Sequence, residues 1–186
     1  MRAIPNILSI FRICLVPVFI VVFFLDGDDT KIYAVLLYAL AAFTDFLDGF
    51  LARRLEASSK LGKFLDPFAD KLMTVSALVC ITIEEIIPIW AVIVTVVKEI
   101  LMAIGGFIVR KKSVAEIPPS NLLGKTSTVF FFLVSAALML FRDIPPNTAV
   151  FMISAAVALA FAALVGYFIT YLNIMRKAKE ESNETG

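Results

Sequence analysis

Residues 45–70 read DFLDGFLARRLEASSKLGKFLDPFAD, and four aspartates stand at fixed intervals within this stretch. Asp45 and Asp48 are three positions apart, and Asp66 and Asp70 are four positions apart. On an α-helix, each of these spacings places the two carboxylates on one face. The stretch therefore predicts two helices joined by a short connection, and their acidic faces can meet if the helices pack as an antiparallel hairpin.

The sequence around this stretch is strongly apolar. Of its 186 residues, 60% are hydrophobic, which exceeds the proportion typical of soluble domains. The apolar residues form blocks of about 20, the length of helix that spans a bilayer. We therefore expect an all-α integral membrane protein with six transmembrane helices, at 7–25, 31–54, 64–83, 87–109, 120–141 and 148–174. We expect one membrane domain over residues 1–186, with a frayed polar tail at 176–186.

Basic residues are concentrated in alternate connections between these spans. The segments 53–63 and 110–112 are rich in Arg and Lys, whereas the connections on the other side contain only Lys31 and Arg142 beside several acids. Cytoplasmic loops carry the excess of Lys and Arg, so both termini and the aspartates are expected on the cytoplasmic side. Because no transit peptide precedes the first span, we expect a multi-pass protein of a prokaryotic plasma membrane. We expect no nucleic-acid partner.

Histidine is absent from the sequence, which excludes catalysis by histidine and zinc sites with histidine ligands. The two cysteines, Cys14 and Cys80, fall inside apolar spans and lack the spacing of a metal pair. We therefore interpret both as packing residues that form no disulfide.

Four aspartates at a membrane boundary require a physical reason, because a carboxylate there is costly. A divalent cation supplies one, since hard cations prefer carboxylate oxygens. Gly49 allows close approach of a ligand to the backbone, and Arg53 offers a forked cation suited to phosphate. The pattern indicates metal-dependent phosphate chemistry on a lipid.

Two other interpretations of the aspartates remain. A single buried aspartate can serve as a structural hydrogen-bonding group, and a proton- or cation-coupled transporter also uses membrane carboxylates. The position of the aspartates near the cytoplasmic ends of their spans, without a matching pair of broken helices, favours an enzyme over a transporter.

Pro67 leaves the start of the third span open. It either opens a helix with Asp66 as N-cap, or it kinks a helix that begins near Ser59. In both cases Asp66 and Asp70 stay about one turn apart.

The stretch from Asp45 to Asp70 resembles the pattern D-x2-D-G-x2-A-R-x8-G-x3-D-x3-D of the CDP-alcohol phosphatidyltransferase family, with all eight defining positions present. The segment PNILS at 5–9 with Arg12, and LDPFADKL at 65–72, also resemble members that use glycerol 3-phosphate. Two segments depart from those members. Lys98-Glu99 stands in place of Arg-Glu, and GKTST at 124–128 in place of Gly-Lys-x-Lys-Thr.

The resemblance implies that the protein transfers a phosphatidyl group from CDP-diacylglycerol to glycerol 3-phosphate, giving phosphatidylglycerophosphate and CMP. A cardiolipin synthase, or another acceptor in the same family, is the alternative. Asp70 is the candidate general base. The expected ligands of Mg²⁺ (or Mn²⁺) are Asp45, Asp48, Asp66 and Asp70. The expected contacts of the CDP group are Asp48, Gly49, Ala52, Arg53 and Gly62, with Asn6 and Thr44 as further candidates.

Candidate contacts for the acceptor phosphate are Lys125 and Arg110, which lie on the expected cytoplasmic side. Arg110 with Lys111 and Lys112 can equally be a membrane anchor. Lys98 and Glu99 fall near the middle of a span, where they either pair with a charge or contact substrate. The resemblance also implies a homodimer.

Overall fold

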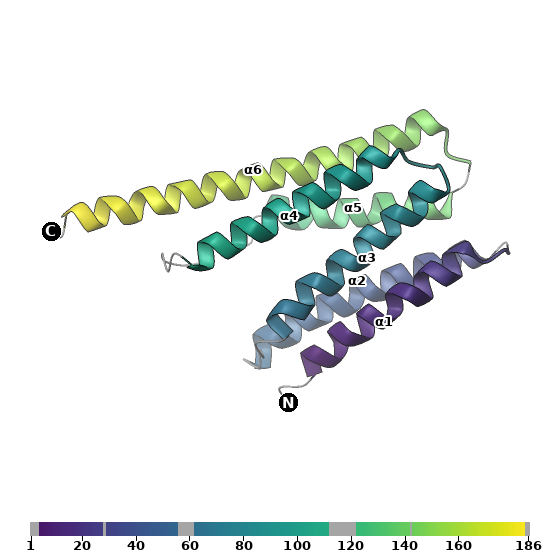
Figure 1. Ribbon diagram of the computed structural model, residues 1–186, viewed down its shortest axis with the longest axis horizontal. Helices are drawn as coiled ribbons and strands as arrows, with labels where there is room; N and C mark the ends of the chain where they lie inside the picture. Colours follow the sequence, from purple (N-terminus) through teal and green to yellow (C-terminus); the bar gives the residue numbers. More distant parts are fainter. Residues whose placement is uncertain (1–3, 28, 56–61, 112–121, 142, 185–186) are drawn as a thin grey trace. The chain divides into compact units, whose positions relative to one another are not determined.

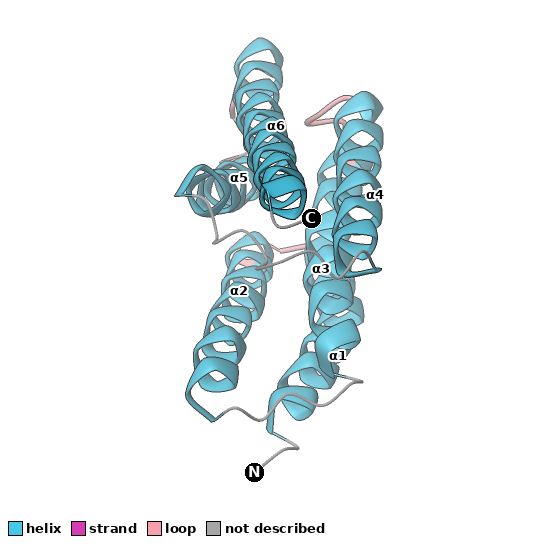
Figure 2. Cartoon of the chain, turned by 90° about the vertical axis from the view of Figure 1, so that its left-hand side faces the viewer, coloured by secondary structure: helices cyan, strands magenta, loops and turns pink. Residues whose placement is uncertain are grey.

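The computed structural model is entirely helical over the residues that it describes, which are 4–27, 29–55, 62–111, 122–141 and 143–184 (Figures 1 and 2). Within these ranges, backbone alone is described at 4–7, 48–55, 62–68, 70, 106–111, 171–175 and 177–184. The described helices are α1 (Ile4–Phe24), α2 (Thr30–Leu55), α3 (Gly62–Ile83), α4 (Ile89–Lys111), α5 (Leu122–Leu140) and α6 (Pro146–Glu184).

Each of the six segments expected to be a span is a helix in this structure, and the bounds of α2 and α5 differ from the expectation by no more than two residues. Within the described ranges, three stretches are long and apolar enough to cross a bilayer: Thr30–Leu47, Leu122–Leu140 and Pro146–Thr170. Leu8–Phe24 and Lys71–Ile83 are shorter apolar stretches. The described residues thus support an all-helical protein with helices that are long and apolar enough to cross a membrane.

The chain divides into two compact units. Unit 1 comprises Met1–Pro88 and Ser135–Ala149, and unit 2 comprises Ile89–Val134 and Val150–Gly186. In unit 1, α1 packs against both α2 and α3, and α2 and α3 also contact each other. The hairpin predicted from the aspartate spacing is therefore present, with α1 as a shared neighbour of both its helices (Figure 1).

Aromatic side chains fill the space between α1 and α2. Phe19 and Phe23 are fully buried, and the ring of Phe19 lies 5.9 Å from that of Phe23 and 6.2 Å from that of Tyr38, measured between centroids. Burying a side chain of this size removes a large apolar area from contact with solvent. The adjacent Phe24 is 42% exposed, so of these two neighbouring phenylalanines Phe23 belongs to the core and Phe24 lies on the surface.

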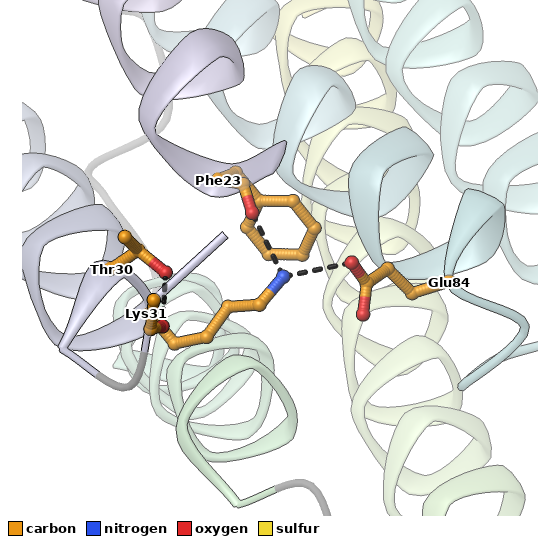
Figure 3. Close-up of polar contacts among 5 residues, drawn as sticks. Phe23, Thr30, Lys31 and Glu84 are labelled. Atoms are coloured by element: carbon orange, nitrogen blue, oxygen red, sulfur yellow. Dashed lines mark hydrogen bonds and ion pairs between the residues drawn. The ribbon is translucent and has the colours of Figure 1, made fainter. Parts of the chain in front are cut away.

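A buried lysine at the start of α2 joins the ends of α1 and α3 (Figure 3). Lys31 Nζ donates to the carbonyl of Phe23 at 2.8 Å, pairs with Glu84 Oε1 at 2.8 Å, and lies 3.8 Å from the centroid of the Phe23 ring. The residue is only 5% exposed. The ammonium satisfies an unpaired carbonyl at the end of α1 and interacts favourably with the ring face. A residue that the sequence places in an outer connection is therefore a buried interhelical contact.

Helix α3 ends in a Schellman motif. Ile86 N–H donates to the carbonyl of Ile81 at 3.1 Å, and Glu85 N–H donates to that of Thr82 at 2.9 Å. Glu85 is left-handed, with φ of 58°, at the position where glycine is usual because glycine has no Cβ to clash. The motif satisfies the last carbonyls of α3 and brings Glu84 to the end of the helix, where it meets Lys31.

The structure decides between the two interpretations of Pro67. Helix α3 begins at Gly62, so Pro67 lies inside the helix and Asp66 is not the N-cap. The alternative in which the helix begins before Pro67 is correct, because the described helix already includes Gly62; Ser59 lies outside the described residues. Pro67 is the sixth residue of this helix, beyond the first four N–H groups that have no intrahelical acceptor. It has no N–H to donate to the carbonyl four residues earlier, so a kink of the helix is expected at this point.

The backbone of α6 remains helical to Glu184, through the segment in which we predicted a frayed tail. The residues after Met175 are mostly Arg, Lys, Ala and Glu, which are strong helix formers. Arg176 and Glu180 stand four positions apart, as do Lys177 and Glu181, and this spacing favours ion pairs along a helix.

Candidate active site

The aspartates of the 45–70 stretch lie at one end of unit 1. Asp45 and Asp48 belong to the C-terminal half of α2, and Asp66 and Asp70 belong to the first turns of α3. The N-terminal end of α1 lies at the same end of this unit (Figure 1). The fold therefore gathers the backbone of all four positions on two contacting helices, as the spacing predicts. The side chains of Asp48, Asp66 and Asp70 lie outside the described residues.

Asp45 forms an ion pair with a buried arginine of α1. Arg12 Nη1 donates to Asp45 Oδ1 at 2.8 Å, across 33 positions of sequence. The side chain of Arg12 is 1% exposed and that of Asp45 is 46% exposed. A hydrogen bond between two ionised groups is about twice as strong as a neutral one. The contact fixes one carboxylate oxygen of Asp45 and leaves nearly half of the side chain accessible.

The donor set of this site suits a hard divalent cation. Asp45 presents an accessible carboxylate, and the other three candidate ligands are also aspartates. Oxygen ligands of this kind favour Mg²⁺, Mn²⁺ or Ca²⁺, whereas zinc prefers sulfur and nitrogen ligands. Among the side chains that the structure describes, no group of three or more acidic or cysteine residues gathers. The proposed ligands therefore remain a prediction: Asp45, Asp48, Asp66 and Asp70. Their carboxylates are chemically suited to a hard divalent cation.

Thr44, a candidate contact of the CDP group, is buried beside Asp45. Its hydroxyl donates to the carbonyl of Ala41 on the same helix at 2.8 Å, and the residue is 6% exposed. The hydroxyl proton is therefore used within α2, and the oxygen is left to accept. The other candidates have helical backbone and side chains outside the described residues: Asn6 on α1, Asp48, Gly49, Ala52 and Arg53 on α2, and Gly62 at the start of α3.

The candidate acceptor residues belong to unit 2. Lys125 is exposed in the first turn of α5, and Arg110 lies in the last turn of α4 with its side chain outside the described residues. Next to Lys125, Gly124 packs against Tyr167 of α6. A Cβ atom built on Gly124 would lie 2.6 Å from the Tyr167 hydroxyl and 2.9 Å from its Cε2. Only glycine fits here without a shift of the tyrosine ring.

Lys98 and Glu99, whose role the sequence leaves open, form an ion pair with each other on α4. Their side chains are 14% and 12% exposed. Charges at such low exposure are retained where they are paired. The structure therefore supports the charge-pair interpretation of these two residues.

The sequence alone predicts no role for Arg12, although the structure places it in contact with Asp45. It is visible in the sequence as part of the segment that resembles the family, and as a lone arginine inside an apolar span. A charge in that position requires an acidic partner. The identity of the partner depends on how α1 packs against α2, which the spacing of residues within each helix does not specify.

Comparison with known proteins places this arrangement in context. Residues 2–171 match the model of a family described as CDP-alcohol phosphatidyltransferase. The cardiolipin synthase (CMP-forming) of Streptomyces coelicolor is 38% identical over 143 residues, which are 75% of this chain and 66% of that protein.

Other relatives have glycerol 3-phosphate in their name. The CDP-diacylglycerol–glycerol-3-phosphate 3-phosphatidyltransferase of Wigglesworthia glossinidia brevipalpis is 39% identical over 123 residues, 64% of each chain. The protein of that name from Escherichia coli is 32% identical over 189 residues, 96% of each chain. The chain thus spans about two thirds of the Streptomyces and Wigglesworthia proteins and nearly all of the Escherichia coli protein.

Proposed function

The chain belongs to the CDP-alcohol phosphatidyltransferase family, and we propose that it transfers a phosphatidyl group from CDP-diacylglycerol to glycerol 3-phosphate. The products are phosphatidylglycerophosphate and CMP. The observation that supports this most strongly is the complete pattern of eight defining residues between Asp45 and Asp70, set on two contacting helices. The relative from Escherichia coli, which aligns over 96% of each chain, supports the choice of acceptor through its name.

The reaction is a displacement at phosphorus. The acceptor hydroxyl oxygen forms a bond to the phosphatidyl phosphorus, and the bond from that phosphorus to the oxygen of CMP breaks. Asp70 accepts the proton of the attacking hydroxyl as general base. Within the 45–70 stretch the sequence offers no Cys, His or Ser nucleophile beside a base, so we propose direct transfer without a covalent enzyme intermediate.

Members of this family generally depend on a divalent metal. We propose Mg²⁺ (or Mn²⁺), held by Asp45, Asp48, Asp66 and Asp70. When bound, the metal supplies positive charge against the pyrophosphate and the departing phosphate oxygen. Asp48, Gly49, Ala52, Arg53 and Gly62, with Asn6 and Thr44, are proposed to hold the CDP group. Lys125 and Arg110 are proposed to bind the acceptor phosphate, because fixed cations recognise its dianion.

Six transmembrane helices with both termini and the aspartates on the cytoplasmic side are part of the proposal. The concentration of Lys and Arg in alternate connections supports it, and so do the three long apolar helices. We further propose that residues 1–186 act as one membrane domain, in a homodimer in a prokaryotic plasma membrane. Bacterial relatives that align over most of the chain support the last point.

A cardiolipin synthase is the second candidate, and a specific observation favours it. The Streptomyces coelicolor protein of that name is 38% identical over 75% of this chain. In addition, Ser127 stands where members that use glycerol 3-phosphate commonly have a lysine. With phosphatidylglycerol as acceptor, the site has no free phosphate dianion to bind, so activity depends less on Lys125.

The test is CMP release by the purified protein in detergent, with CDP-diacylglycerol and Mg²⁺. Glycerol 3-phosphate, phosphatidylglycerol and inositol 1-phosphate are added one at a time, each with an EDTA control and a control without protein. Release that needs both metal and glycerol 3-phosphate supports the proposal. CMP release with only one of the other alcohols identifies that alcohol as the acceptor in place of glycerol 3-phosphate. If folded protein releases no CMP with any acceptor, the proposal is rejected and the cation- or proton-coupled transporter is favoured.

A further inference from the structure

We propose that Arg12 is a positioning residue, which holds the carboxylate of Asp45 in the orientation that binds the divalent cation. The proposal rests on the function proposed above, in which Asp45 is a metal ligand. It assigns a role to the first helix, which contains none of the four aspartates. Arg12 contacts a residue of the candidate site and is not itself placed against the reacting atoms.

The geometry of the pair supports this role. Arg12 Nη1 lies 2.8 Å from Asp45 Oδ1, and the two residues come from α1 and α2. A free aspartate side chain turns about two bonds, so its oxygens sample several positions. An ion pair to one oxygen restricts this rotation before any cation arrives. Partners that orient metal ligands commonly affect metal affinity or activity by about 10- to 100-fold.

The difference in burial between the two side chains indicates which one is the fixed point. Arg12 is 1% exposed, while Asp45 is 46% exposed. A guanidinium enclosed by packed helices cannot turn toward solvent without leaving an unfilled space between those helices. An accessible carboxylate, in contrast, can bind a ligand that arrives from solvent. The arginine is therefore the anchor, and the aspartate is the group it presents.

A purely structural role for Arg12 is the alternative, since any buried ion pair between helices resists their separation. The same unit contains a matched control. Lys31 and Glu84 also form an interhelical ion pair at 2.8 Å, with a buried cation and a partly exposed carboxylate. Glu84 lies at the other end of α3 from Asp66 and Asp70. If Arg12 serves only to hold helices together, its loss resembles the loss of Lys31.

The experiment compares Arg12→Met, Arg12→Lys and Lys31→Met with the wild-type protein in detergent. Mn²⁺ binding is measured by electron paramagnetic resonance without any substrate, and thermal unfolding is followed without metal. We expect Arg12→Met to weaken Mn²⁺ binding by about tenfold and Lys31→Met to leave it unchanged, although both lower the melting temperature. Arg12→Lys, which keeps the charge without the planar fork, is expected to give an intermediate Mn²⁺ affinity.

A double-mutant cycle shows whether Arg12 acts through Asp45. Asp45→Ala is expected to weaken Mn²⁺ binding, and adding Arg12→Met to it is expected to cause no further loss. Unchanged or tighter Mn²⁺ binding in Arg12→Met overturns the proposal. If Arg12→Met does not fold, wild-type affinity in Arg12→Lys overturns it equally.

This outcome is separable from that of the proposed function. Wild-type protein that binds Mn²⁺ through Asp45 but releases no CMP with any acceptor refutes the proposed reaction and leaves the role of Arg12 intact. Wild-type protein that releases CMP, with Mn²⁺ binding indifferent to Arg12, refutes the positioning role alone.

Discussion

Lys31 Nζ lies 2.8 Å from Glu84 Oε1, which fastens the start of α2 to the end of α3. The same ammonium donates to the carbonyl of Phe23 at the end of α1. The carbonyl of Phe23 and the carboxylate of Glu84 thus share one cation (Figure 3). Glu84 follows the end of α3, whereas Asp66 and Asp70 lie in its first turns. A pair that is largely withdrawn from solvent resists loss of one partner, because the remaining charge is left without compensation.

Replacing Lys31 with Met is expected to destabilise the protein by about 2 kcal/mol, less than the ~3–5 kcal/mol for a fully buried pair, because the Glu84 side chain is 31% exposed. The measurement is thermal or chemical unfolding in detergent. Asp26→Asn is the control, since Asp26 is exposed in the connection between α1 and α2. Equal stability of the Lys31 and Asp26 variants would show that this ion pair contributes nothing.

Replacing Gly124 with Ala is expected to destabilise the protein by about 1–3 kcal/mol, the usual cost of overpacking. The added methyl group would lie 2.6 Å from the Tyr167 hydroxyl, so the ring must move. Unfolding in detergent measures the effect. Tyr167→Ala in the same protein should remove most of the difference between glycine and alanine at position 124.

Gly105 provides the matched control for this prediction. It also lies inside a helix of unit 2, but a Cβ atom built there meets nothing within 4 Å. Gly105→Ala is therefore expected to be neutral or stabilising by up to about 1 kcal/mol, the difference in helix propensity. Equal destabilisation by the two substitutions would refute the close contact of Gly124 with Tyr167.

Replacing Asp70 with Asn is expected to abolish turnover while largely sparing binding of CDP-diacylglycerol, because the amide cannot accept the proton of the acceptor hydroxyl. CMP release measures turnover, and binding is measured by competition with a labelled CDP-diacylglycerol. If Asp70→Asn retains turnover, the general base is another residue.

Replacing Lys125 with Ala is expected to raise KM for glycerol 3-phosphate by about tenfold, equivalent to ~1.4 kcal/mol, with little change in KM for CDP-diacylglycerol. The lysine is exposed at the start of α5, where it can reach an anionic ligand. Thr128→Ala is the control, because Thr128 is also exposed on the next turn of α5 and donates to the carbonyl of Gly124. An unchanged KM for the acceptor would remove Lys125 from the site.

The sequence predicts the helices well because each apolar run is long and is bounded by polar or turn residues. The segment expected at 31–54 is helical at Thr30–Leu55, and the one expected at 64–83 is helical at Gly62–Ile83. The start of α3 could not be chosen in advance, because proline fits both the first turn of a helix and a kink. The aspartate spacing correctly placed the four positions on two neighbouring helices.

The sequence does not specify how each helix is rotated about its axis, and therefore which of its side chains are buried. Phe23 and Phe24 are neighbours of the same type, yet the first is fully buried and the second is 42% exposed. Similarly, Gly105 and Gly124 both lie inside helices of unit 2, yet a Cβ atom at Gly105 would meet nothing within 4 Å, while one at Gly124 would meet Tyr167. Such differences depend on long-range packing, and an apolar residue inside a membrane span has no polar face to reveal its direction.

Helix α1 is held at two points along α2, and this fixes their register. Arg12 meets Asp45 near one end, and the carbonyl of Phe23 accepts from Lys31 near the other. Eleven residues separate the two contacts on α1, about 17 Å along the axis at 1.5 Å per residue. Sliding of one helix along the other by a single turn breaks both contacts together. An opening that admits a lipid substrate is therefore expected to keep α1 and α2 in this register, because sliding one helix along the other loses both contacts.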